Sequence, residues 1–227
     1  GVLHTERFAH CSAHSGAHVA FRGRAIFAAA LFSLAWSGLG IAYGVWGEAV
    51  LIPLQAAADV LRYGAWYIFL LLLLAPEGTK SPQKRPFGPW LIPLLWLVIV
   101  GGLFLHLGRG HNSLPSELLT RATLFQALSM AVLGLMLIEQ LFRNVSSDSL
   151  WNIKPLCLGL GSQFAFDLYL YSDALLFNQL DADAFAVRGF VQVCVIPLLL
   201  IATSRSRDWI SRELAEGRRV EVSVLAP

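Results

Sequence analysis

The sequence predicts an all-α protein, a polytopic membrane bundle of about six transmembrane helices with both ends of the chain in the cytoplasm. Composition is the first of three observations that predict it. Of the 227 residues, 56% are hydrophobic and only 14% are charged, whereas a soluble domain is about 25% charged. The second observation is a set of apolar runs, each near the roughly 20 residues that a helix needs to cross the hydrocarbon core. The third is the distribution of basic residues between these runs.

Six runs qualify as transmembrane spans. Each is expected to be a helix, because a backbone in lipid must satisfy its own hydrogen bonds and no run shows the alternating pattern of a transmembrane β-strand. In chain order, the expected spans are residues 25–46, 49–75, 89–107, 117–142, 155–177 and 184–203. The connections between them are short, so no separate domain is expected between the spans.

Basic residues set the expected orientation, since cytoplasmic connections carry an excess of Lys and Arg. The outer connections contain Arg109 as their one basic residue, beside Glu48, Asp181 and Asp183. With the N-terminus inside, the basic residues of the inner segments are Arg22, Arg24, Lys80, Lys84, Arg85, Arg143, Lys154, Arg205, Arg207, Arg212, Arg218 and Arg219. This bias predicts that both ends are cytoplasmic.

The chain divides into three expected segments. They are a polar, His-rich leader at 1–22 that is not native-like, the six-helix membrane domain at 23–204 and a cytoplasmic tail at 205–227. In a helix, His10, His14 and His18 would share one face and could bind a metal. The favoured interpretation is a leader without a metal site, and we expect both ends of the chain to be truncated.

Ionisable side chains inside the expected spans are the strongest candidates for function, because a charge at the membrane centre costs about 2.5–3.5 kcal/mol on insertion scales. Asp59 and Arg62 are three residues apart and share a helix face. Asp167 lies at mid-depth of the fifth span, and a salt bridge between Asp167 and Arg62 is expected. The candidate sensing cluster is Asp59, Arg62, Gln163, Asp167, Tyr169, Tyr171 and Asp173.

A second group of charged residues lies near the expected membrane interfaces. Glu117 and Arg121 begin the fourth span, and Glu139 and Arg143 end it, so each pair has the i,i+4 spacing at which side chains meet on a helix. Arg188 lies at the start of the sixth span. All five are expected to be interfacial.

The buried polar residues leave several roles open. Gly159, Gln163, Asp167 and Tyr171 follow i,i+4 spacing, so they form a stripe on one face of the fifth helix. The stripe could join helices through hydrogen bonds worth about 0.6 kcal/mol each, or it could form a sensing or ligand site. A proton or ion pathway is disfavoured, because too few charges line up across the full depth.

Other classes of protein are less well supported. The main alternative, a stand-alone small-molecule transporter or permease, would need a continuous polar path and usually internal repeats, and neither is visible. An intramembrane enzyme using Asp167 and Asp173 is disfavoured, because residues six apart lie about 120° apart around a helix and roughly 9 Å along it. The sequence has no HExxH, GxSxG or Walker motif and no basic patch for nucleic acid. Catalytic and metal-binding residues are therefore not expected.

Several motifs resemble one known family. They are DVLRYGAW at 59–66, IEQLFRN at 138–144, WNIKPLCLGLG at 151–161, FAFDLYLYSDALLF at 164–177 and LDADAFAVRGFV at 180–191. Together they resemble the N-terminal membrane region of the sensor histidine kinase of the PEP-CTERM/exosortase system, the PrsK family. The resemblance covers about residues 25–209.

The resemblance implies the signal-input domain of a two-component histidine kinase, a multi-pass protein of the bacterial inner membrane linked to exopolysaccharide production and PEP-CTERM protein export. It also implies a homodimer in the lipid bilayer, and a cytoplasmic response regulator as partner through a kinase core. Only that core would use ATP and Mg²⁺. The family's phosphoacceptor histidine motif and ATP-binding motifs do not occur in this sequence, so no cofactor and no catalytic residue is expected on it, and it should be inactive alone.

Overall fold

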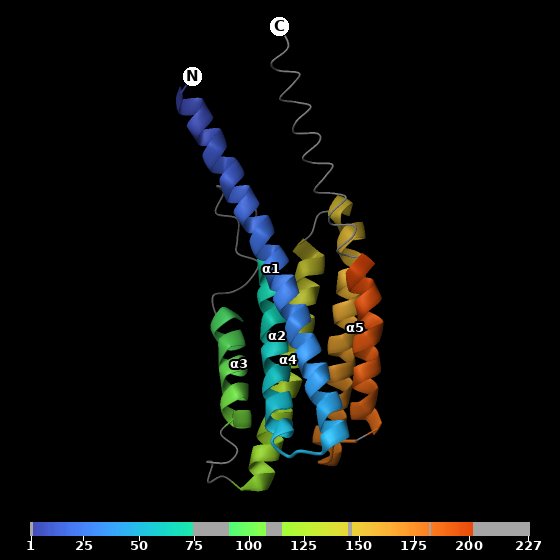
Figure 1. The fold of residues 1–227 in the computed structure, drawn as a ribbon. Helices are drawn as coiled ribbons and strands as arrows, with labels where there is room; N and C mark the ends of the chain where they lie inside the picture. The colour runs from blue at the N-terminus through green and yellow to red at the C-terminus, as the bar shows by residue number, and fades with distance from the viewer. Residues whose placement is uncertain (1, 75–90, 108–114, 145–146, 182, 202–227) are drawn as a thin grey trace.

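The computed structural model describes residues 2–74, 91–107, 115–144, 147–181 and 183–201, with side chains from Gly23 onward apart from residues 107 and 147–152. The helices in these ranges are α1 (Val2–Trp46), α2 (Leu51–Leu74), α3 (Leu91–Leu107), α4 (Ser116–Asn144) and α5 (Ser147–Phe177), followed by a sixth helix at Asp183–Ile201 (Figure 1). The described part of the chain contains no strand. The prediction of an all-α fold is therefore confirmed there.

Four of these helices are long and apolar enough to cross a membrane. They are residues Gly23–Trp46 of α1, all of α2, all of α4 and the sixth helix. α3 is apolar but shorter, and α5 carries Gln163, Asp167 and Asp173 within its apolar run and is not among the four. The structure thus supports a membrane bundle, while the count of six spans stays a prediction.

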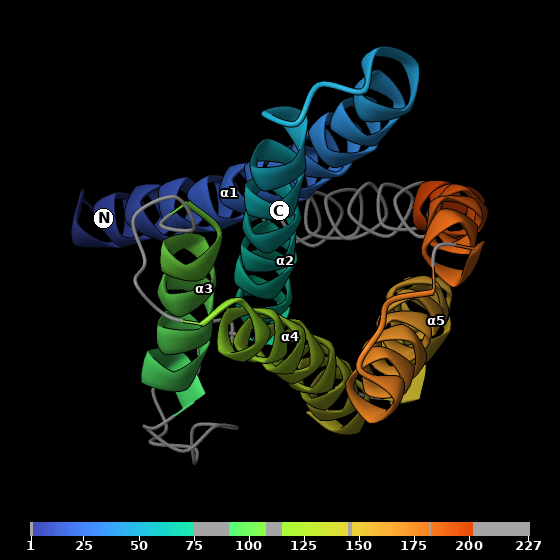
Figure 2. The ribbon, with the colours of Figure 1, turned by 90° about the horizontal axis from the view of Figure 1, so that it is seen from below.

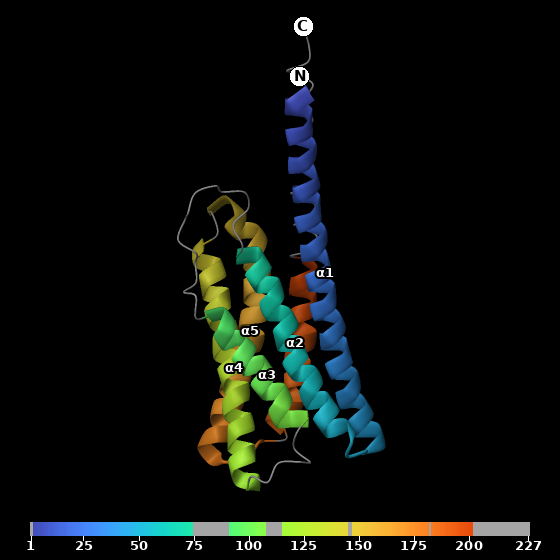
Figure 3. The same cartoon turned by 90° about the vertical axis from the view of Figure 1, so that its left-hand side faces the viewer.

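The helices run up and down the bundle in sequence, as the views in Figures 1 and 3 show. The start of α1 and the end of the sixth helix therefore lie at the same end of the bundle, the upper end in Figure 1. This agrees with an even number of passes. That the shared end is the cytoplasmic one stays a prediction from the basic residues.

α1 is a single helix from Val2 to Trp46. The backbone of the leader at 2–22 thus continues directly into the first span, without a break at the expected boundary. The tail expected at 205–227 lies outside the described residues.

Two tight turns place neighbouring helices side by side. Gly47 follows α1 with φ at 67°, a left-handed conformation that glycine adopts without strain, and its N–H donates to the Tyr43 carbonyl at 2.8 Å. Asn178 ends α5 in the same way with φ at 56°. Asp181 then caps the sixth helix, because its Oδ1 accepts from the backbone N–H of Asp183 at 2.9 Å. These turns pair α1 with α2 and α5 with the sixth helix.

The apolar core lies around α2, which has α1, α3 and α4 about it (Figure 2). Tyr63, Leu70 and Phe164 are fully enclosed. Phe164 of α5 stacks on the Tyr63 ring, with 5.3 Å between centroids. On its other side it fits against Gly134 of α4, where an added Cβ would come within 2.6 Å of the Phe164 ring. A glycine on α4 therefore allows α4 and α5 to approach closely.

Large apolar side chains cover the outside of the bundle. Phe27, Leu97 and Phe190, from α1, α3 and the sixth helix, are each at least 70% exposed. Such a surface would be unfavourable in water, since large contiguous apolar patches on soluble monomers are rare. It suits helices that face lipid.

Candidate functional site

α2 carries the first half of a buried charged cluster. Asp59 and Arg62 are three residues apart, so their side chains leave the same face of the helix. Arg62 donates from Nε and Nη2 to Oδ1 of Asp59, at 3.0 and 2.7 Å. Both lie inside the bundle, with Asp59 8% and Arg62 1% exposed. α2 therefore contributes two opposite charges that are matched within one helix.

α5 and the sixth helix contribute the second half. Asp167 on α5 is 0% exposed and Arg188 on the sixth helix is 3% exposed. Arg188 donates from Nε to Oδ1 of Asp167 at 2.6 Å and from Nη2 to Oδ2 at 3.2 Å. This two-point contact between a planar guanidinium and a carboxylate is the geometry of the strong pairs. It fixes α5 against the sixth helix.

Arg188 also joins the two halves. Its Nη1 donates to Oδ2 of Asp59 at 2.8 Å, and its Nη2 donates to Oδ1 of Asp59 at 3.2 Å. Nη2 of Arg62 lies 3.7 Å from Oδ2 of Asp167. Asp59, Arg62, Asp167 and Arg188, called the charged cluster below, thus bring together two formal positive and two formal negative charges. The formal charge of the cluster is zero.

Neutral polar side chains add hydrogen bonds at the edge of the charged cluster. Tyr63 of α2 donates its hydroxyl to Oδ2 of Asp167. Gln192 of the sixth helix, one turn after Arg188, accepts from Nη1 of Arg62 through its Oε1 at 2.8 Å. Both contacts run between helices, so they add to the connections that the ion pairs make.

Aromatic rings cover the two guanidiniums. The Trp36 ring of α1 lies 4.8 Å from Cζ of Arg62 and 4.9 Å from Cζ of Arg188, measured to the ring centroid. The Tyr171 ring of α5 lies 5.5 Å from Cζ of Arg188. Cations are attracted to the faces of aromatic rings, most strongly to Trp. α1, which supplies no charge, therefore still contacts the charged cluster through Trp36.

Mutual pairing explains how four charges stay inside an apolar bundle. An ion moved out of water without a partner costs several kcal/mol even after relaxation. In the charged cluster each carboxylate contacts both guanidiniums, so the charges offset one another. The arrangement holds α2, α5 and the sixth helix in one relative position, and a shift of any one of them would break or exchange these contacts.

The structure separates the predicted sensing residues into two groups. Asp59, Arg62 and Asp167 lie in the charged cluster, and Tyr171 contacts it. Gln163 is buried on the same face of α5, but its side-chain amide makes no hydrogen bond to these groups within the described part of the chain. The remaining two, Tyr169 and Asp173, do not join the cluster.

Tyr169 and Asp173 lie away from the charged cluster for different reasons. Tyr169 is 61% exposed and packs against Phe166 on the outside of α5. Asp173 is half-buried near the end of α5, where it lines a small polar hollow with Phe177 and Asp181. Tyr169 and Asp173 thus share a side of α5, as their i,i+4 spacing indicates, but that side does not face the charged cluster.

The predicted Asp167–Arg62 contact is present, but it is the longest ion pair of the cluster at 3.7 Å. The main partner of Asp167 is Arg188, which was expected at the interface. The structure places the Arg188 side chain inside the bundle, where it is 3% exposed and reaches both carboxylates, while its depth in the membrane stays a prediction. Its long side chain turns into the bundle from the second turn of the sixth helix, so its position near the helix end did not reveal these contacts.

The other two predicted pairs have different outcomes. Glu139 and Arg143 form an exposed ion pair at 3.2 Å, as their spacing predicts. Glu117 and Arg121 are both exposed, and Nε of Arg121 instead donates to Oδ1 of Asn178 at 3.3 Å. The last contact joins α4 to the end of α5.

Sequence reasoning missed Trp36, Tyr63 and Gln192 as neighbours of the charged cluster. A signal for Gln192 was available, since it follows Arg188 at i,i+4 and is polar inside an apolar run. Tyr63 follows Arg62 directly, but one residue along a helix is a different face, so spacing gave no reason to choose it. Trp36 lies in an apolar helix and carries no pattern that distinguishes it from a lipid-facing Trp.

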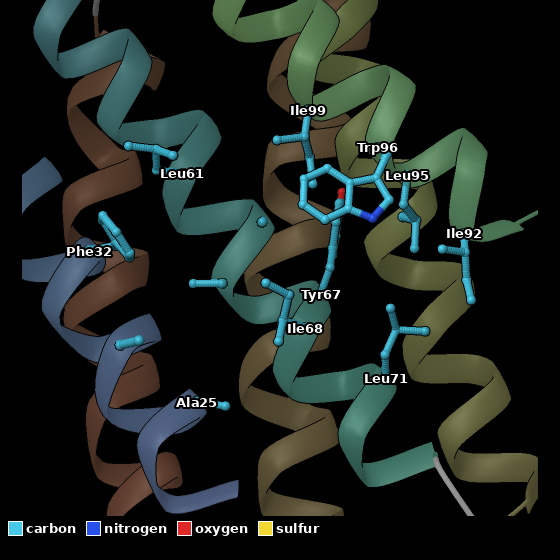
Figure 4. A pocket seen from close by; sticks show the side chains of 13 residues that line it. Ala25, Phe32, Leu61, Tyr67, Ile68, Leu71, Ile92, Leu95, Trp96 and Ile99 are labelled. Carbon is cyan, nitrogen blue, oxygen red and sulfur yellow. The ribbon is translucent and has the colours of Figure 1, made fainter. Parts of the chain in front are cut away.

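An apolar cavity of about 260 Å³ lies between α1, α2 and α3, away from the charged cluster. Figure 4 shows Phe32, Ile68, Leu95, Trp96 and Ile99 around it. The hydroxyl of Tyr67, another lining residue, donates to the Met130 carbonyl. The lining residues therefore offer van der Waals contact and no charge. Among the residues that the structure describes, no group of three or more His, Cys, Asp or Glu is placed to hold a metal ion.

Comparison with known proteins finds no matching family model, no matching curated protein and no matching solved structure. The fold and the charged cluster thus define a class only: an all-helical bundle with helices long and apolar enough to span a membrane, and a buried ion cluster of zero formal charge. The kinase resemblance of the quoted motifs stays a prediction.

Proposed function

We propose that this chain is a membrane sensor domain, the signal-input part of a two-component histidine kinase in the bacterial inner membrane. The observation that carries the proposal is the charged cluster, in which Arg188 ties the sixth helix to both α2 and α5. The sequence after this helix is rich in Arg, as expected of a segment that continues into the cytoplasm. The kinase part of the proposal is supported by the motifs that resemble the PrsK family.

The charged cluster has the properties that a switch needs. A signal can shift a protein between two packings only if it binds them unequally, and the two packings must differ in definite contacts. Arg188 contacts Asp59 and Asp167 at once, so a displaced sixth helix would keep one carboxylate partner and lose the other. Because Arg188 is near the start of its helix, the cluster lies toward the end that carries the 178–181 connection. The sixth helix then links that end to the predicted cytoplasmic end.

A transporter, and a cluster that only holds helices together, can each be distinguished from a sensor. A transporter needs a path, yet the four charged residues are at most 8% exposed and contact one another. A cluster that only holds helices together would affect stability without affecting output.

The family is tested by the native gene on both sides of this reading frame. An in-frame kinase core downstream, with a phosphoacceptor histidine and ATP-binding motifs, is the expected result. A stop codon directly after Pro227 with no kinase gene nearby would contradict the kinase proposal, and flux assays for a transporter would follow.

The switch is tested by autophosphorylation of the full-length kinase in nanodiscs. Arg188→Gln and Asp59→Asn each remove one charge from the cluster, and Glu139→Gln removes one from an exposed pair as the matched control. The proposal expects the basal rate to change in the two cluster variants and to stay at the wild-type value in the control. Folded cluster variants with the wild-type rate would show that the cluster is structural only.

A further inference from the structure

Gln163 on α5 is buried without hydrogen bonds. The side chain is 2% exposed, and neither Oε1 nor Nε2 has a hydrogen-bond partner among the described residues. A buried polar group left without a partner costs about 1–3 kcal/mol, and lipid offers no hydrogen bonds to reduce that cost. A complete amide without partners therefore indicates an occupant other than protein.

A second unpartnered group lies on α2. The indole Nε1 of Trp66 has no hydrogen-bond partner in the described part of the chain, and the residue is 1% exposed. Trp66 follows Arg62 by four residues on α2, and Gln163 precedes Asp167 by four residues on α5. Since α2 and α5 run in opposite directions (Figure 1), both steps lead toward the same end of the bundle.

Helix geometry places these two groups at one level. Arg62 and Asp167 face each other, with 3.7 Å between Nη2 and Oδ2. Residues four apart lie on nearly the same helix face, about one 5.4 Å turn away. Gln163 and Trp66 therefore lie at about one level, one turn beyond the charged cluster, on the sides of α5 and α2 that carry Asp167 and Arg62.

The chemistry of the unpartnered atoms selects the occupant. Gln163 offers two N–H donors and a carbonyl acceptor, and Trp66 offers one N–H donor, so an occupant must both accept and donate. It must also be small and uncharged, because the neighbouring charged cluster has no net formal charge to offset an ion. A buried water typically makes about three hydrogen bonds. We propose that Gln163 and Trp66 form a buried water-binding site one turn from the charged cluster, a site that is independent of the proposed sensor function.

The test is hydroxyl-radical footprinting by synchrotron radiolysis of the full chain in nanodiscs, with water itself as the probe. Radiolysis of a bound water oxidises the side chains beside it even when bulk solvent cannot reach them. The wild-type chain is expected to show oxidation at Trp66 despite its burial. Gln163→Leu, which keeps the approximate volume and removes the amide, is expected to lower that oxidation several-fold. Trp46, 71% exposed at the end of α1, is the internal reference and should label equally in both.

Trp66→Phe provides an independent variant, because it removes only the indole donor and its adjoining ring. Its reporter is Tyr63, which is 0% exposed, and its oxidation should also fall. Size-exclusion profiles identify any variant that does not fold, in which case the other variant decides. No Trp66 oxidation in the wild-type chain, or equal oxidation in the wild type and both folded variants, would overturn the proposal.

Discussion

The Asp59–Arg62 pair of α2 and the Glu139–Arg143 pair of α4 have the same chemistry and nearly the same spacing, but opposite surroundings. The first pair has side chains 11% and 1% exposed, and its charges also meet partners from α5 and the sixth helix. The second pair has side chains 62% and 68% exposed and no such neighbours among the described residues. Spacing along a helix thus decides that two side chains can meet. Partners from other helices decide how much the contact contributes to stability.

The largest expected effect comes from removing one carboxylate of the charged cluster. Asp167→Asn leaves two guanidiniums with one carboxylate inside the bundle, and breaking a buried pair costs about 3–5 kcal/mol. The measurement is the free energy of unfolding in mixed micelles, from a titration with a denaturing detergent. A loss no greater than that of an exposed-pair variant would mean that the buried and exposed pairs do not differ in strength.

A packing variant tests whether the buried region is sensitive to any change or to charge in particular. Gly134→Ala places a methyl group within 2.6 Å of the Phe164 ring, and such overpacking costs about 1–3 kcal/mol. Gly161→Ala on α5 is the matched control, because an added Cβ there meets nothing within 4 Å. In thermal unfolding, the midpoint temperature should fall below the wild-type value for Gly134→Ala only. Equal midpoints for both variants would show that α4 and α5 pack less closely than described.

Double-mutant cycles rank the contacts within the charged cluster. Asp167 with Arg188 should show a larger coupling energy than Asp167 with Arg62, because the first pair makes contacts of 2.6 and 3.2 Å and the second one of 3.7 Å. Couplings between contacting residues are typically about 0.5–3 kcal/mol. The cycles use Asp167→Asn with Arg188→Gln and with Arg62→Gln, measured by unfolding. The reverse ranking would mean that Arg62 is the main partner.

The smallest expected effect is that of the exposed pair. Glu139→Gln should change the free energy of unfolding by about 0.3–0.5 kcal/mol, the usual contribution of an i,i+4 pair on a helix surface. Added salt should reduce the difference from wild type further, since exposed charges are screened. A salt-independent loss as large as that of Asp167→Asn would indicate that Glu139 is enclosed in the membrane-embedded protein.

Hydropathy and spacing predicted the helical class and the ion pairs within single helices, but not how side chains from different helices come together in the charged cluster. The apolar runs predicted part of every described helix, but not the first parts of α1 and α5, and the i,i+3 and i,i+4 rules predicted the Asp59–Arg62 and Glu139–Arg143 contacts. The Asp167–Arg62 contact was predicted from equal depth alone. Depth along a helix says nothing of which helices are neighbours or how far a long side chain reaches, so the contacts of Arg188 with both carboxylates and the position of Trp36 were missed.

The same limits explain the failed spacing prediction. Glu117 and Arg121 have the spacing of a pair, yet Arg121 contacts Asn178 of the turn after α5. An exposed pair is worth so little that a neighbouring amide can take its place. Side-chain spacing is therefore reliable only where burial makes an unpaired charge costly.

The division of charges between helices has a consequence for how the chain is inserted during synthesis. α2 carries a matched pair, so it can leave the translocation channel with its charges already offset. α5 has no basic residue within one turn of Asp167, and the sixth helix has no acidic residue within one turn of Arg188. Each is the other's nearest opposite charge in the finished bundle, 21 residues away along the chain. In the predicted six-span topology, the two helices would therefore reach the lipid most favourably together, as a closed hairpin, after α2 is already in place to receive it.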